Sequence, residues 1–181
     1  MHTLHWVAIK ADSKEEALAT VNDNLLPNED GYRLADWSDW FVAGGGRYNQ
    51  QGDGYTEGYA NMVISYSEQP DKFKEVLNNI KTYRKSFMNE KLTKLPTAID
   101  KLQSDIVDYI SNDCKLEDKR QYDFSRWDIK DCISMLNNMW TPDSGFYDNQ
   151  EFTSSLQYLE ERLDNEEQGA LQYLVPVDFH F

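Results

Sequence analysis

The sequence lacks most features that mark secreted, membrane and metal-dependent proteins. Its only two cysteines, Cys114 and Cys132, have no metal-like spacing, and both lie in segments that read as helical, which predicts buried thiols. The chain begins without a basic segment followed by an apolar run, and no stretch approaches the roughly 18 apolar residues of a membrane helix. We therefore expect a cytoplasmic protein without a membrane segment, a structural metal or a cofactor.

Positive charge is also scarce. The 181 residues carry 18 Lys and Arg against 32 Asp and Glu, for a net charge of −14, and residues 143–167 contain Arg162 as their single base. Such a surface repels nucleic acid and predicts that the protein does not bind it directly. The same surface can attract a basic protein partner, or it can simply maintain solubility.

The apolar pattern predicts one α+β domain over residues 1–181. Residues 2–11 favour a strand, and Ser13 with Glu16 forms a capping box that starts a helix. Short strands are expected at Trp40–Ala43 and Met62–Tyr66. Apolar residues at helical spacing then predict an insert of three to four helices over about 70–168, with a helix boundary at Pro96. The apolar stripes of these helices are expected to be core, and that of the last helix includes Phe152, Leu156, Leu159 and Leu163.

The chain closes on a predicted strand over residues 171–181. Val175, Val177 and Phe179 alternate with Pro176 and Asp178, and a proline within a strand indicates an edge or a bulge. Both terminal segments are thus strands. We expect them to pair in a small, mostly antiparallel sheet of the ferredoxin-like kind.

An aromatic and glycine-rich segment is the first candidate site. Successive glycines can form an anion-binding nest, an arginine suits phosphate or carboxylate, and aromatic rings can stack a base. The segment matches neither common phosphate-binding fingerprint, so a simple bulge with core aromatics remains the alternative. The predicted ligand-binding residues are Trp37, Trp40, Gly44, Gly45, Gly46, Arg47 and Tyr48.

The terminal strands supply a second candidate site. All three histidines lie on them, and Asp178 shares one strand face with His180. If the strands are neighbours, His5, Asp178 and His180 could meet on the open face and perform acid–base chemistry. A surface cross-strand pair is the alternative interpretation.

The segment from Trp40 through Gly45, Gly46, Arg47 and Tyr48, together with the closing strand Tyr173–His180, resembles small uncharacterised proteins encoded by bacteriophages. The resemblance covers the two ends of the chain and excludes the helical middle. It implies a viral origin and an accessory role in the host cytoplasm. Proteins with this role include inhibitors of host defence, such as anti-CRISPR or anti-restriction proteins. They also include proteins that sequester nucleotide signals. It implies no particular functional residue.

Three functional hypotheses follow. The first is an acidic inhibitor that binds a basic, nucleic-acid-handling host protein. The second is a protein that binds a nucleotide or another small anion through the Gly44–Tyr48 loop. The third is an enzyme that uses His5, Asp178 and His180.

Overall fold

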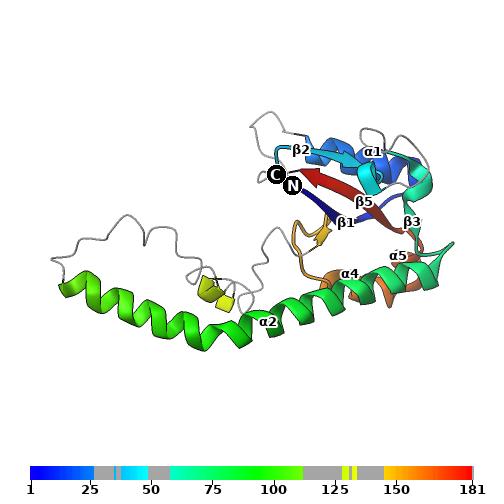
Figure 1. Ribbon diagram of the computed structural model, residues 1–181. Coiled ribbons are helices and arrows are strands. Elements are labelled where there is room, and N and C mark those ends of the chain that lie inside the picture. The colour runs from blue at the N-terminus through cyan, green and yellow to red at the C-terminus, as the bar shows by residue number, and fades with distance from the viewer. Residues whose placement is uncertain are drawn as a thin grey trace. The chain divides into compact units, whose positions relative to one another are not determined.

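The computed structural model describes residues 1–26, 35, 38–48, 58–111, 128–130, 132–133 and 145–180. They belong to two compact units, the first formed by Met1–Ile80 with Pro142–Phe181 and the second by Lys81–Thr141. The helices and strands with defined bounds are β1 (His2–Lys10), α1 (Lys14–Leu25), β2 (Trp40–Ala43), β3 (Ile64–Ser65), α2 (Pro70–Ser111), β4 (Phe146–Asp148), α4 (Gln157–Leu163), α5 (Glu166–Ala170) and β5 (Gln172–His180) (Figure 1).

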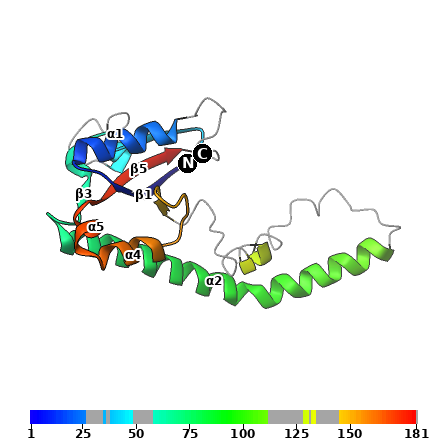
Figure 2. The same cartoon turned by 180° about the vertical axis from the view of Figure 1, so that it is seen from behind.

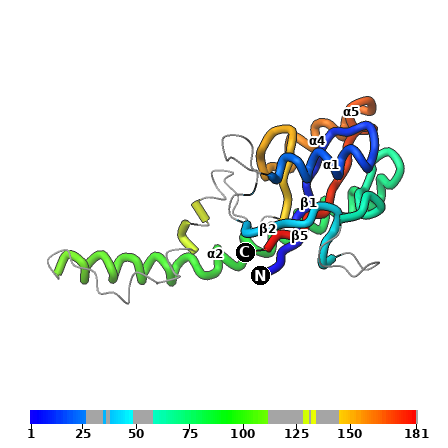
Figure 3. Tube along the Cα trace, turned by 90° about the horizontal axis from the view of Figure 1, so that it is seen from above, coloured from blue at the N-terminus to red at the C-terminus, as the bar shows by residue number. Residues whose placement is uncertain are grey.

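The described strands of the first unit form a mixed five-stranded sheet. Its strand order is β2-β5-β1-β4, and β3 pairs with the other end of β5. Strands β1 and β5 are antiparallel over their full lengths, from His2 opposite His180 to Lys10 opposite Gln172, so the two chain ends lie together (Figure 3). Strand β2 pairs antiparallel with the last residues of β5, whereas β4 runs parallel to β1.

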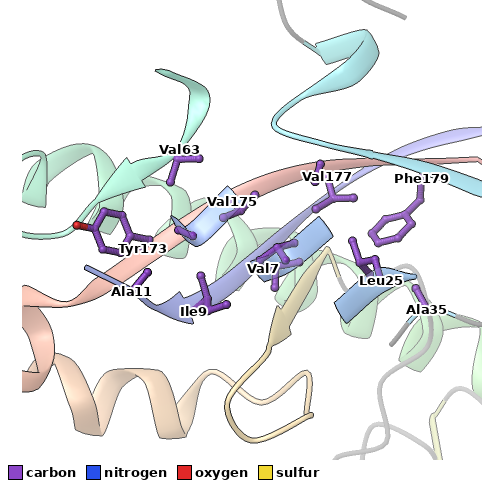
Figure 4. Packing of buried hydrophobic residues seen from close by; sticks show 13 residues of the cluster. Val7, Ile9, Ala11, Leu25, Ala35, Val63, Tyr173, Val175, Val177 and Phe179 are labelled. Carbon is purple, nitrogen blue, oxygen red and sulfur yellow. The ribbon is translucent and has the colours of Figure 1, made fainter. Parts of the chain in front are cut away.

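Helix α1 covers one face of this sheet. Ser13 caps it by accepting a hydrogen bond from the Glu16 amide at 3.1 Å, which confirms the predicted start. Its buried residues Ala17, Val21 and Leu25 pack against alternate residues of the two long strands. The cluster seen in Figure 4 also includes Val7, Ile9, Val175, Val177 and Phe179.

On the opposite face of the sheet, the described helices of this unit cover one end and leave the other end uncovered by helix. The start of α2 and helix α4 pack there against Ala8, Phe146 and Leu174, and Figure 2 shows these helices on the side away from α1. Within the predicted last helix, Leu159 is fully buried as expected. Phe152 is not core: it lies in the turn after β4 with a φ of 49°, and 66% of it is exposed.

Helix α2 is continuous, so the predicted boundary at Pro96 is wrong. The helix starts with Pro70 at its first position, where a missing amide hydrogen costs nothing, and continues to Ser111 with Pro96 inside. An interior proline loses one backbone hydrogen bond and typically costs about 3 kcal/mol. Ala98, two residues after the proline, is almost fully buried.

The second unit does not bury every apolar residue of its predicted stripes. Ile99 and Ile106 of α2 are about half exposed, at 49% and 50%, so these two positions are not core. Lys91 connects α2 to the following segment through an ion pair with Asp128 at 2.8 Å. Cys132 is buried as predicted, and Cys114 lies outside the described residues.

The α+β class is therefore confirmed. The finer ferredoxin-like expectation is not confirmed, because strand β4, which no pattern in the sequence predicts, runs parallel to β1 at the sheet edge.

Candidate functional site

The glycines that follow β2 form a turn whose positive φ angles favour glycine. Gly44, Gly45 and Gly46 have φ angles of 89°, 112° and 47°, a region that other L-residues rarely adopt. A Cβ atom on Gly46 would lie 2.7 Å from the Cβ of Asp178. This glycine therefore allows the turn, which continues as a 3₁₀ helix over Gly46–Tyr48, to approach β5 closely.

The turn begins as a bulge opposite Pro176. The amides of Gly44 and Gly45 both donate to the Pro176 carbonyl oxygen, at 2.7 and 3.1 Å. Two successive residues facing one residue of the partner strand define a β-bulge. Pro176 lies in β5, between β1 and β2, so of the two predicted explanations for a strand proline, the bulge applies and the edge does not.

Asp178 joins the two sites that the sequence suggested separately. Its carboxylate is fully buried, and Oδ2 accepts a hydrogen bond from the Arg47 amide at 2.8 Å. Its other oxygen, Oδ1, is 2.9 Å from Nδ1 of His2. A carboxylate only accepts hydrogen bonds, so this contact places a proton on Nδ1 of His2. The glycine turn and His2 thus meet at one carboxylate, which is the anion that the Arg47 amide holds.

Three rings pack together beside this carboxylate. His2 and His180 face each other across β1 and β5 with ring centroids 5.1 Å apart at 71°. The Trp40 ring stacks on His180 at 5.1 Å and 9°, and His2 approaches Trp40 edge-on at 5.3 Å. Each ring contacts the other two, so their relative orientation is set by packing.

His180 has a second carboxylate near its Nδ1 atom. The Oδ2 atom of Asp39 lies 3.4 Å away, at ion-pair distance, although this buried nitrogen makes no aligned hydrogen bond. A backbone hydrogen bond also joins the two residues, because the Asp39 amide donates to the His180 carbonyl oxygen at 2.8 Å. Both imidazoles therefore direct Nδ1 toward a carboxylate.

The structure does not bring His5 to Asp178 and His180. His5 pairs with Val177 and lies on the α1 side of the sheet, fully buried between Tyr147 and Phe179. Side chains alternate between the two faces of a strand, so His2, three residues earlier, lies on the face of Asp178 and takes the place expected of His5.

Arg47 and Tyr48 are exposed beside the ring cluster. Partial burial of the Tyr48 hydroxyl raises its pKa above the ordinary value, the Asp178 carboxylate raises it further, and Arg47 partly offsets the rise. Gly44, Gly45 and Gly46 are buried, so of the predicted loop residues that the structure describes, only Trp40, Arg47 and Tyr48 present side chains at the surface. Trp37 lies outside the described residues.

Sequence reasoning missed His2 and Asp39. Full-length antiparallel pairing of the terminal strands places His2 opposite His180, but no local pattern in the sequence gives this register. Asp39 directly precedes β2, and nothing in its local sequence distinguishes it from the other acidic residues.

A second buried carboxylate has a structural role. Asp148 is fully buried and pairs with Nη2 of Arg162 at 2.6 Å, while the Nε atom of Arg162 donates to Gln172 at 3.4 Å. Asp148 also accepts hydrogen bonds from the amides of Gln150 and Glu151. These bonds hold β4 against α4 and β5.

An open hollow of about 410 Å³ lies between α1 and β2. Its lining includes Leu18, Asn22, Phe41 and Gly58, and none of the imidazoles. The ring cluster is therefore a site on the surface of the sheet, separate from this hollow.

Within the described part of the chain, no group of three or more His, Cys, Asp or Glu side chains is arranged to hold a metal ion. No helix of that part combines the length and apolar character needed to cross a membrane. Comparisons with protein-family models, curated proteins and solved structures find no match to this chain.

Proposed function

We propose that this protein binds a small anionic ligand with a planar ring, of the nucleotide type, on the surface formed by His2, Trp40, His180, Arg47 and Tyr48. We call this surface, with Asp178 beneath it, the imidazole site. One observation carries the proposal: the glycine turn and both terminal strands converge on Asp178, which orders His2 and the Arg47 backbone together.

The side chains of the imidazole site suit such a ligand. Arg47 offers the planar, two-pronged donor group that pairs with phosphate, and the imidazoles donate hydrogen bonds or carry positive charge. Trp40 is 39% exposed and Tyr48 is 38% exposed, which leaves aromatic surface for stacking a base.

We further propose that the site is built on a split β–α–β unit of the ferredoxin-like kind. Strands β1 and β2 both run antiparallel to β5, which lies between them, and α1 connects them. Strand β4 is then an addition at the free edge of β1.

Thermal unfolding with a panel of mononucleotides, cyclic nucleotides and dinucleotides tests the binding proposal. A ligand at 100 times its dissociation constant stabilises the folded state by about 2.7 kcal/mol, which raises the midpoint by several degrees. Arg47→Ala should abolish this shift. Lys72→Ala, which removes an exposed base from α2, is the matched control and should leave it unchanged. The proposal is wrong if no nucleotide shifts the midpoint.

A second candidate is the inhibitor of a basic host protein that the bacteriophage resemblance implies, acting in the host cytoplasm. The supporting observation is an acidic surface over α4 and α5, where Glu161, Asp164, Glu166 and Glu167 are all exposed. Arg162, the base among them, is largely buried and paired with Asp148. Such a surface speeds association with a basic partner, and salt weakens the effect.

Binding to a panel of host nucleases and CRISPR effectors tests this candidate. The double variant Glu161→Lys/Glu166→Lys should slow association with any partner found, and 0.5 M salt should slow the unaltered protein similarly, since the screening length falls to roughly 4 Å. Binding that is insensitive to both changes would exclude a role for the acidic surface.

A further inference from the structure

Each of the two histidines of the imidazole site has a carboxylate beside one of its ring nitrogens. Their Nδ1 atoms face the carboxylates of Asp178 and Asp39, at 2.9 and 3.4 Å. An imidazole whose Nδ1 is held by a carboxylate presents Nε2 as its reactive atom. Neither Nε2 atom makes a hydrogen bond to any described residue, and the His2 and His180 side chains remain 17% and 33% exposed.

The environments of the two imidazoles differ in a way that assigns their roles. Asp178 is fully buried and bonded to His2, so it stabilises the imidazolium that forms when Nε2 of His2 takes up a proton. Asp39 is 70% exposed and only approaches His180, whose ring also stacks on Trp40. His2 is thus suited to be the base and His180 the acid.

We infer that the imidazole site hydrolyses a small cyclic phosphodiester of a ribonucleotide, such as a nucleoside 2′,3′-cyclic phosphate. This inference rests on the proposed function, because it names the ligand class and adds a reaction at the same surface. The ring centroids of His2 and His180 are 5.1 Å apart, so both imidazoles can contact oxygens of one phosphate group, one acting as base and the other as acid. The strongly negative chain disfavours long RNA and favours a small substrate.

The reaction balances with water as the only co-reactant. Nε2 of His2 removes a proton from water while the water oxygen forms a bond to phosphorus. The bond from phosphorus to one ribose oxygen breaks, and that oxygen receives a proton from Nε2 of His180. The product is a nucleoside monophosphate, and proton exchange with solvent restores both imidazoles. Arg47 contacts the phosphate oxygens, and Asp178 acts as a positioning residue that orients His2.

Turnover of the four nucleoside 2′,3′-cyclic phosphates by the full-length protein, followed by chromatography and phosphorus NMR in the presence of EDTA, tests the inference. We expect one monophosphate product. His2→Asn and His180→Asn should each lower kcat by about 10²–10⁴-fold with little change in KM. Arg47→Ala should mainly raise KM, and Lys72→Ala should change neither constant.

Far-UV circular dichroism of each variant establishes that it is folded, and a thermal shift with the nucleoside monophosphate product measures binding separately from turnover. Binding without turnover, turnover that requires a metal, or turnover that survives both histidine changes overturns the inference and leaves the proposed function intact. Absence of both binding and turnover overturns both.

Discussion

The close approach of the glycine turn to Asp178 can be tested by comparing two alanine substitutions. Gly46 has a φ of 47°, and a Cβ there would lie 2.7 Å from Asp178 Cβ and 2.9 Å from Val42 Cβ. Gly145 has a φ of 70°, and a Cβ there would meet no atom within 4 Å. Both alanines incur the left-handed backbone cost of about 1–2 kcal/mol. Only Gly46→Ala adds overpacking, which typically costs about 1–3 kcal/mol more.

We therefore expect Gly46→Ala to lower the free energy of unfolding by about 2–5 kcal/mol and Gly145→Ala by about 1–2 kcal/mol. Urea unfolding followed by far-UV circular dichroism measures both values, and an unchanged slope confirms that stability alone has changed. Gly46→Ala must also displace Asp178, so it should weaken nucleotide binding in the thermal-shift assay, whereas Gly145→Ala should not. Equal losses of stability in the two variants would refute the close packing of Gly46 on Asp178.

Three further predictions concern the same compact unit. Arg162→Met leaves the buried Asp148 without its ion-pair partner and should cost about 3 kcal/mol in urea unfolding, since breaking a buried pair is strongly destabilising. Ser13→Ala removes the cap of α1 and should cost about 1 kcal/mol in the same assay. The raised pKa of Tyr48 means that the folded state holds this proton more tightly, so stability conferred by Tyr48 is complete below about pH 10 and is lost as the pH rises further. Tyr48→Phe should remove that alkaline loss, and a variant that loses stability in parallel with the unaltered protein would contradict the shift.

The features of the fold that the sequence predicted correctly are those set by residues close together in the chain. Ser13 and Glu16 are three positions apart and satisfy the same helix end, so the start of α1 follows from local hydrogen bonding. Alternation along one strand places Asp178 and His180 on a common face whatever the partner strand does. Because proline has no amide hydrogen, Pro176 predicted either an edge strand or a bulge, and the bulge is present.

At two places the backbone follows a path that the sequence pattern does not predict. A proline favours a helix boundary, yet the helical residues on both sides of Pro96 continue the turn and retain most of the backbone bonds. Phe152 fits a helical stripe by spacing, but the chain turns after β4 and leaves its ring exposed. In the first case the helix continues past the predicted boundary, and in the second the helix begins only at Gln157, after Phe152.

The sequence by itself determined which residue types are available to the site and which of them share a strand face. Only the tertiary structure decided that His2, and not His5, joins Asp178 and His180, because that choice depends on the register between strands about 170 residues apart in the chain. A shift of one residue moves every side chain of β1 to the other face. Register is set where Val7 and Ile9 of β1 pack together with Val175 and Val177 of β5 under α1, an interaction between segments at opposite ends of the chain.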